Sequence, residues 1–344
     1  MSANSINASE QARIEEEARF AERGVSLWQD AWRRLLRNRM AVAGLIFICI
    51  LIFCFVTADL LPTFGRVLPF FYSYREADYD SVRIGPTWPD HIMGTDKLGR
   101  DVFSRIWWGV RISLTVAVVG SLTSLVIGIT YGSISGYLGG RIDNLMMRFV
   151  DVMYGFPTLL FIILIMVVLP SESAIQGMVN IFIAIGIVGW MGMARLIRGQ
   201  FLSLREKEFV LAARMVGAGS GRIISRHLLP NSLGPAIVSL TLGIPGLILT
   251  EATLSFIGLG VPPPYPSWGQ MVNEGWRGLR ATPHLTIFPG LAITLTMLAF
   301  NFLGDGLRDA LDPTMRGTTL VASRRKRRKA LRLAEKRREA ARQG

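Results

Sequence analysis

The nearest approach to a nucleotide-binding motif is the stretch GTDKLGRD at residues 94–101. A P-loop has the form G-x-x-x-x-G-K-[ST], and its Lys and hydroxyl group hold the phosphates and Mg²⁺. Here the glycine spacing is kept, but Arg100 and Asp101 stand where Lys and Ser or Thr are required. We therefore expect no nucleotide site, and we expect the two glycines and Asp96 to form turns.

Histidine and cysteine residues are also poorly placed for chemistry. His91, His227 and His284 are far apart and form no HExxH motif, so no zinc site is expected. Cys49 and Cys54 share one apolar segment and, five residues apart, point in different directions on a helix. The sequence therefore predicts a non-enzymatic chain with no metal or cofactor of its own.

Glu251 is an ionisable residue deep in an apolar segment, about eighteen residues from where we expect that segment to enter a membrane. A carboxylate at such depth is costly and usually faces protein or water. Two interpretations stay open: Glu251 lines the outer mouth of a transport pathway, or it is a hydrogen-bonded structural acid. The segments lack the series of buried acids and histidines typical of a proton-driven pump, so energy for transport should come from elsewhere.

The polar stretch EFVLAARMVGAGSGRIISRHLLPN, which begins at Glu208, predicts two short helices. Gly217 should end the first helix, Ser220 should cap the second, and Pro230 should end it before the next apolar segment. Such a hairpin either supports its own membrane helices or docks a soluble partner. Residues at i, i+3, i+4 and i+7 give the first helix one apolar face: Phe209, Ala212, Ala213 and Val216.

The composition indicates a membrane protein that spans the bilayer several times. Half of the 344 residues are hydrophobic and 18% are charged, whereas about a quarter are charged in soluble domains. A bilayer-spanning helix needs about 20 apolar residues. Six runs free of Asp, Glu, Lys and Arg are the candidate spans: 41–58, 112–140, 152–171, 173–194, 227–250 and 281–304.

Charge places both termini inside the cell. With that orientation, 29 of the 38 Lys and Arg residues lie in the inside loops and tails, as the positive-inside rule requires. The expected organisation is all-α and N-in/C-in. Its parts are a cytoplasmic segment 1–40, a six-helix domain 41–305 with an extracytoplasmic segment 59–111 and a cytoplasmic hairpin 195–232, and a basic tail 306–344. We expect the tail to meet anionic lipid rather than nucleic acid, since no aromatic residues are interleaved with its cations.

Small residues recur every fourth position in the second candidate span. They let helix backbones approach closely in lipid, so the stripe predicts a tightly packed neighbour. The stripe comprises Gly120, Ser124, Gly128, Gly132, Gly136 and Gly140.

The hairpin resembles the E-A-A, three residues, G, nine residues, I-x-L-P motif of permease subunits of bacterial binding-protein-dependent ABC importers. Gly217, Leu229 and Pro230 match in register, while Leu211 replaces the acid and His227 the isoleucine. Six further segments are similar to the oligopeptide/dipeptide permeases, most closely to the second permease subunit of such importers. They are SLWQDAWRRLLRNRMAVAG, GTDKLGRDVFSR, YGSISGYLGGRID, ARLIRGQFLSLREKEF, LSFIGLGVPPPYPSWGQM and FNFLGDGLRDALDP.

The resemblance implies the architecture of a type I (MetI-like) importer permease and a mechanism of alternating access. It implies a heterodimer with a second permease, two cytoplasmic ATPases that bind ATP and Mg²⁺, and an external binding protein that delivers peptide. Each ATPase would grip one hairpin. The coupling residues carried over are Glu208, Phe209, Ala212, Ala213, Gly217, Leu229 and Pro230.

Three alternatives remain open at this point. The first keeps the importer and changes its cargo to nickel or another small solute. The second is an ion-driven carrier that works alone. The third is a membrane anchor whose basic tail binds nucleic acid.

Overall fold

The computed structural model describes residues 27–60, 71–169 and 173–312. These residues form helices joined by loops, and the one β-bridge among them joins Thr95 and Asp101. The chain divides into two units, Met40–Arg308 and the combination of Met1–Arg39 with Asp309–Gly344. Nearly all of the basic tail expected at 306–344 lies outside the described residues.

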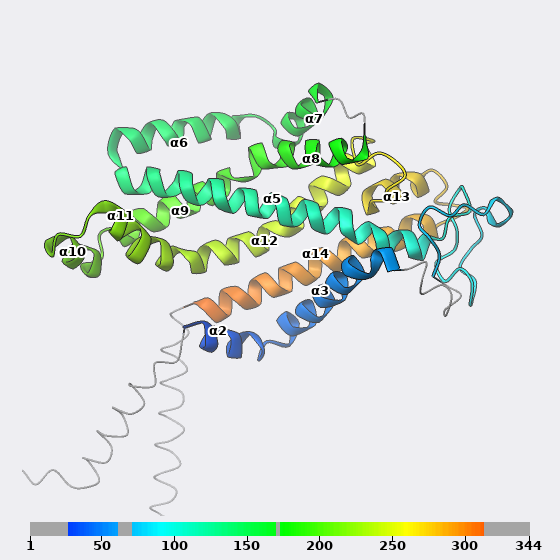
Figure 1. Ribbon diagram of the computed structural model, residues 1–344, viewed down its shortest axis with the longest axis horizontal. Helices are drawn as coiled ribbons and strands as arrows, with labels where there is room; N and C mark the ends of the chain where they lie inside the picture. Colours follow the sequence, from blue (N-terminus) through cyan, green and yellow to red (C-terminus); the bar gives the residue numbers. More distant parts are fainter. Residues whose placement is uncertain (1–26, 61–70, 170–172, 313–344) are drawn as a thin grey trace, which may run out of the picture. The chain divides into compact units, whose positions relative to one another are not determined.

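The helices follow one another with short connections over most of the described chain (Figure 1). The α-helices are α2 Leu27–Leu35, α3 Arg39–Thr57, α5 Val102–Leu138, α6 Gly140–Gly155, α7 Thr158–Val168, α8 Ala174–Gly189, α9 Met191–Leu204, α10 Glu208–Met215, α11 Ser220–Ile223, α12 Leu229–Phe256, α13 Trp268–Trp276 and α14 His284–Leu311. A π-helical turn, Ile224–Leu228, joins α11 to α12.

Among the described residues, five helical stretches are long and apolar enough to cross a membrane, and the bent pair α6–α7 brings the number to six if it is one span. The six predicted segments correspond to these five stretches and the bent pair. The predicted span 152–171 was wrong as a single straight helix, because the chain bends by 82° between α6 and α7. Phe156 is extended there (φ −91°, ψ 136°), since the following Pro157 disfavours the helical conformation.

The predicted second span began too late. The structure starts α5 at Val102, whereas the charge-free run begins at residue 112. Arg105 and Arg111 occupy the first turns of α5 and are partnered, Arg105 by Asp96 and Arg111 by Asp59 at 2.7 Å. A run defined by the absence of charge therefore misses a helix whose charges are paired.

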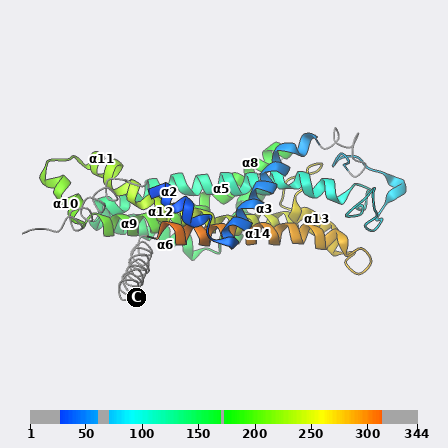
Figure 2. The same ribbon diagram turned by 90° about the horizontal axis from the view of Figure 1, so that it is seen from below.

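Within the unit Met40–Arg308, α5 is the central helix and contacts α6, α8, α9, α12 and α13. Figures 1 and 2 both show α10 and α11 at one end of α5, and residues 71–101 with α13 at the other end. The two polar regions expected on opposite sides of a membrane thus lie at opposite ends of the helices.

The predicted stripe of small residues packs as expected over most of its length. A Cβ atom on Gly128 would lie 2.5 Å from the Met193 Cβ, and one on Gly136 would lie 2.7 Å from the Phe201 Cβ, both on α9. Gly140 departs from the prediction, because the helix ends at Leu138 and Gly140 has φ +58° with open space around it.

Candidate functional site: the α10–α11 hairpin

The first helix of the hairpin has well-defined ends. Lys207 is extended (φ −78°, ψ 146°) and Glu208 opens the first turn of α10, where a carboxylate is favourable against the helix dipole. After Met215 the chain reverses at Gly217, which has φ +84°, a conformation that other residues adopt at a cost. The N–H of Ala218 donates to the carbonyl of Ala213 at 3.0 Å and completes the turn. Gly217 therefore ends the helix, as its position predicted.

The second half of the hairpin differs from the prediction at both ends. Gly219, rather than Ser220, is the N-cap residue of α11, and it provides no side-chain cap. Pro230 does not end a helix: it is the second residue of α12 and directly follows the π-helical turn Ile224–Leu228. The helical stretch Ser220–Phe256 therefore links the hairpin directly to the fifth span.

Burial shows which side chains attach α10 to the rest of the protein. Val210 is fully buried and packs in one cluster with Ile197 and Phe201 of α9 and with Ile223 and Leu228. The sequence pattern missed this anchor, because Val210 is not on the face that the i, i+3, i+4, i+7 spacing selected.

The predicted apolar face is instead largely exposed. Val216 is 89% exposed and Phe209 is 42% exposed, with its ring 6.2 Å from that of His227. Met215, beside Val216, is 88% exposed. Among the predicted hairpin residues, Ala213 and Leu229 are half-buried, while Glu208, Ala212, Gly217 and Pro230 are exposed. The helix thus presents an apolar tip that no described part of the chain covers.

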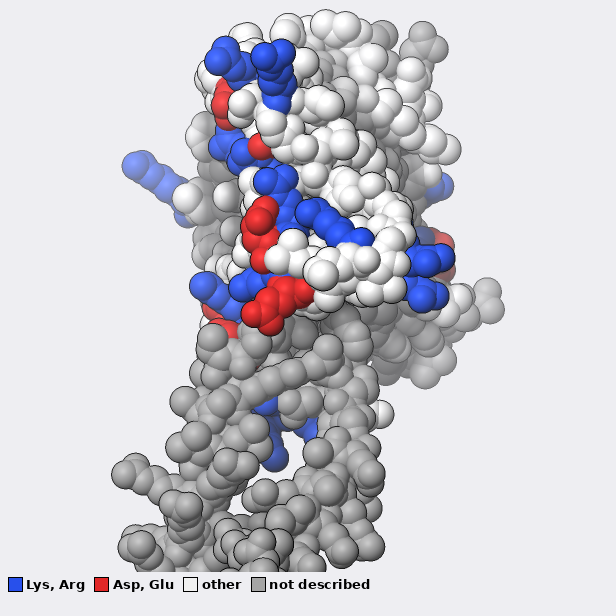
Figure 3. Space-filling view, turned by 90° about the vertical axis from the view of Figure 1, so that its left-hand side faces the viewer, with Lys and Arg blue, Asp and Glu red and all other residues white. Residues whose placement is uncertain are grey.

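Cations surround this tip. Figure 3 shows Lys and Arg side chains gathered on the end of the molecule that carries α10 and α11. In the hairpin segment 195–232, four of the Lys and Arg side chains are exposed and make no ion pair with a described residue. They are Lys207, Arg214, Arg222 and Arg226.

The ion pair between the buried Asp143 on α6 and the half-buried Arg198 on α9 was not predicted. Arg198 donates from Nε to Oδ1 at 2.5 Å and from a terminal nitrogen to Oδ2 at 2.6 Å, and Ser135 of α5 donates to Oδ1 at 2.5 Å. Three helices therefore meet at one carboxylate. No sequence signal identified the pair, since both residues fall in segments interpreted as inside loops.

Glu251 is separated from the hairpin. It lies 22 residues beyond Leu229 on α12, about 33 Å along the helix axis. Its side chain is fully buried and accepts hydrogen bonds from Ser113 of α5 at 3.1 Å and Ser255 at 2.7 Å. In this structure the Glu251 side chain is enclosed by its partners.

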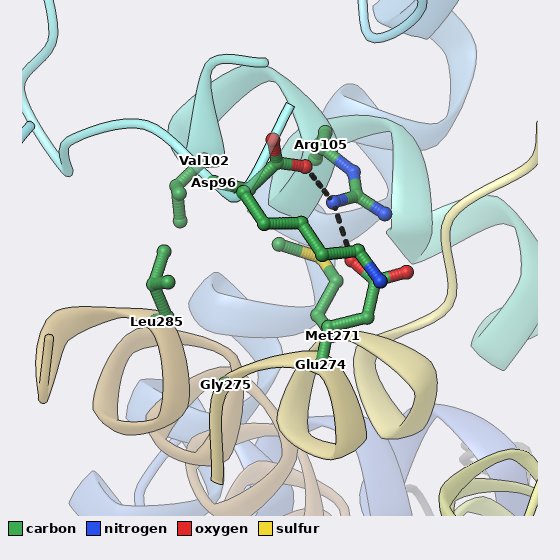
Figure 4. Close-up of a pocket in the computed structure, with 8 residues that line it drawn as sticks. Asp96, Val102, Arg105, Met271, Glu274, Gly275 and Leu285 are labelled. Atoms are coloured by element: carbon green, nitrogen blue, oxygen red, sulfur yellow. Dashed lines mark hydrogen bonds and ion pairs between the residues drawn. The ribbon is translucent and has the colours of Figure 1, made fainter. Parts of the chain in front are cut away.

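At the opposite end of α5, the GTDKLGRD stretch forms turns, as predicted. Gly94 and Gly99 have positive φ angles, and Asp96 accepts hydrogen bonds from the N–H groups of Leu98 (2.8 Å) and Arg100 (3.0 Å). Arg105 donates hydrogen bonds to both Asp96 and Glu274 of α13, and its bond to Glu274 is 2.9 Å long. These three residues line a small pocket (Figure 4).

Two carboxyl groups at this end have shifted pKa values. Burial by itself would raise the pKa of Asp96, but Arg105 and Arg100, together with two backbone N–H groups, hold it below its usual range. Burial raises the pKa of Asp101, and hydrogen bonds with Ser104 and His91 offset only part of that increase. Asp101 also caps α5, because its side chain accepts from the Ser104 N–H at 2.7 Å.

Residues 128–317 match the family described as "Binding-protein-dependent transport system inner membrane component". The chain belongs to this family. Residues 26–86 of the permease also match the "N-terminal TM domain of oligopeptide transport permease C". With its membrane-spanning helices, the permease is a multi-pass protein of the inner membrane.

Curated relatives resemble the permease over most of their length. The oligopeptide transport system permease protein OppC of Bacillus subtilis is 44% identical, over 87% of this chain and 93% of its own. The dipeptide transport system permease protein DppC of the same organism is 46% identical, over 85% and 87%. The glutathione transport system permease protein GsiD of Pectobacterium atrosepticum is 42% identical, over 84% and 92%. The family resemblance inferred from the motifs is thereby confirmed.

Proposed function

We propose that this permease is a membrane-spanning subunit of an ATP-driven importer that carries oligopeptides or dipeptides across the cytoplasmic membrane. The observation that carries the proposal is the agreement among its relatives, whose names give oligopeptides, dipeptides and glutathione as their cargo. These are all short peptides, so a peptide cargo is favoured over nickel.

Energy for transport comes from a separate ATPase that docks on the α10–α11 hairpin. The chain has no P-loop, so it needs a partner to use ATP. Met215 and Val216 supply an apolar tip that is almost fully exposed, which suits insertion into a groove on a partner protein. The basic side chains around the tip favour a partner surface that carries carboxylates.

The orientation supports this assignment. An excess of Lys and Arg marks the hairpin end as cytoplasmic, where ATP is available. Residues 71–101 and α13 then face outward, and we assign the delivery of peptide by an external binding protein to that end. A second permease completes the pathway, and a second ATPase serves the second permease.

The test is transport by the assembled complex in proteoliposomes. The two permeases, their ATPases and the cognate binding protein are reconstituted together, and uptake of a radiolabelled tripeptide and of radioactive nickel is compared. We expect peptide accumulation that requires ATP and the binding protein, with no accumulation of nickel. Accumulation of nickel without peptide, or peptide transport by the permeases alone, would contradict the proposal.

A further inference from the structure

Helix α9 carries the hairpin directly. Only residues 205–207 separate α9 from α10, and they form a tight turn: the Arg205 N–H donates to Phe201 at 3.0 Å and the Lys207 N–H to Leu204 at 3.1 Å. Val210 of α10 is buried in the same cluster as Phe201. A displacement of α10 must therefore move the end of α9.

Helix α5 is held to α9 by backbone proximity. Gly128 and Gly136 leave no room for a side chain against Met193 and Phe201 of α9, as their hypothetical Cβ distances of 2.5 and 2.7 Å indicate. Close packing of this kind over several turns makes α5 and α9 move together.

Helix α6 is attached to α9 through side chains rather than through close backbone packing. Its N-cap residue Gly139 (+65°) and its first residue Gly140 (+58°) both have positive φ, and it ends at the break before Pro157. Asp143 and Val150 are its only buried residues. Because both ends adjoin bends in the backbone, the position of α6 relative to α9 depends on side-chain contacts.

Two ion pairs join α6 to α9, and they differ in burial. The Asp143 side chain is 7% exposed, and both of its oxygens are engaged by Arg198, whose side chain is 32% exposed. In the Asp151–Arg195 pair, at 2.5 Å, the side chains are 63% and 44% exposed. Exposed pairs contribute little, whereas removal of one partner from a buried pair leaves a costly unpaired charge.

We propose that Asp143 and Arg198 are positioning residues that make α6, and the bent α6–α7 segment, follow the movement of α9 and its hairpin. The inference rests on the proposed function, because it requires a partner ATPase to move α10. When the pair is broken, α9 and α5 still follow the hairpin, but α6 keeps the hydrogen bond from Tyr131 of α5 and the contacts of Arg195, so it follows less fully. ATP hydrolysis then continues while fewer peptides are moved for each ATP.

The test measures peptide uptake and ATP hydrolysis in the same proteoliposomes of the full complex. In Asp143→Asn we expect the ratio of uptake to hydrolysis to fall roughly tenfold, since the amide carries no charge and cannot accept at both of the positions that Arg198 engages. The matched control is Asp151→Asn, which removes the exposed pair between the same helices. There we expect the ratio to stay within about twofold of wild type.

A second variant separates this role from a general defect in folding. Arg198→Lys keeps the positive charge but loses the two-point contact, so the ratio should fall to an intermediate value. If Asp143→Asn does not assemble with the ATPases, Arg198→Lys decides the test. A ratio like that of wild type in Arg198→Lys, or an equal fall in Asp151→Asn, would overturn the inference. Failure of the proposed function would be visible separately, as absence of ATP-driven peptide uptake by the wild-type complex.

Discussion

Gly136 on α5 lies so close to Phe201 on α9 that a Cβ atom on the glycine would be 2.7 Å from the phenylalanine Cβ. The contact lies one turn before α9 leads into the hairpin. It belongs to the stripe of small residues that fixes α5 against α9. The same stripe therefore supports the fold and connects the central helix to the coupling region.

Replacement of Gly136 by Leu should destabilise the permease. A larger side chain must push α5 and α9 apart, and overpacking of this kind costs about 1–3 kcal/mol or more. The control is Gly199→Ala, because Gly199 lies in α9 with nothing within 4 Å of its hypothetical Cβ. Thermal unfolding of the purified permease in detergent measures both. A lower melting temperature for Gly136→Leu and an equal or higher one for Gly199→Ala are expected; equal losses would contradict the packing account.

The Asp96 cluster predicts a defined dependence of stability on pH. The pKa of Asp96 is depressed in the folded protein, so its contribution to stability is present at neutral pH and is lost as the pH falls through that depressed value. Asp96→Asn should cost about 3 kcal/mol at pH 7, because Arg105 loses one of its two buried partners.

The measurement is the difference in melting temperature between wild type and Asp96→Asn. The difference should be constant from about pH 8 to 5 and should shrink below about pH 4, where the unfolded carboxyl is also protonated. A difference that shrinks between pH 8 and 6 would show that a group other than Asp96 controls the effect.

Substitutions at Glu251 can separate its two proposed roles, that of a structural acid and that of a pathway residue. As a structural acid, Glu251 accepts hydrogen bonds from Ser113 and Ser255, so Glu251→Ala should leave both hydroxyls unpartnered at about 1–3 kcal/mol each. Glu251→Gln keeps an acceptor and the side-chain volume, so it should retain most of the stability and most of the uptake. Normal melting with lost peptide uptake in Glu251→Gln would instead assign Glu251 to the transport pathway.

The sequence predicted the number of apolar segments and the small-residue stripe because both depend on patterns along one helix. The break at Phe156 was missed, although Pro157 could have indicated it. Arg105 and Arg111 misled the search for the second span, since their compatibility with a long helix depends on Asp96, Glu274 and Asp59, which are distant in sequence.

Similar limits applied to the hairpin. Gly217 predicted the turn correctly, because the requirement for positive φ is local to that residue. The periodicity did not identify Val210 as the anchor, because its burial depends on Phe201, Ile223 and Leu228 from other elements. Asp143 and Arg198 could not be paired from the sequence, since 55 residues separate them.

Val216→Asp should weaken the complex with the ATPase without unfolding the permease. The side chain is 89% exposed, so a charge there costs little in the isolated chain, but it would be buried without a partner in an apolar groove. Co-purification of the ATPase should fall at least about tenfold while the melting temperature stays within about 2 °C of wild type. The matched control is Tyr79→Asp, which changes a residue that is 75% exposed at the opposite end of the helices. That variant should keep the ATPase.

The central claim, that the hairpin tip contacts the ATPase, is tested most directly by cross-linking in the intact complex. Val216→Cys is introduced into a chain with Cys49 and Cys54 replaced by alanine, and Tyr79→Cys serves as the control at the opposite end. A short bifunctional thiol–amine reagent should join Cys at 216 to the ATPase subunit and should not join Cys at 79 to it. Absence of the cross-link at 216 in a complex that imports peptide would contradict the account.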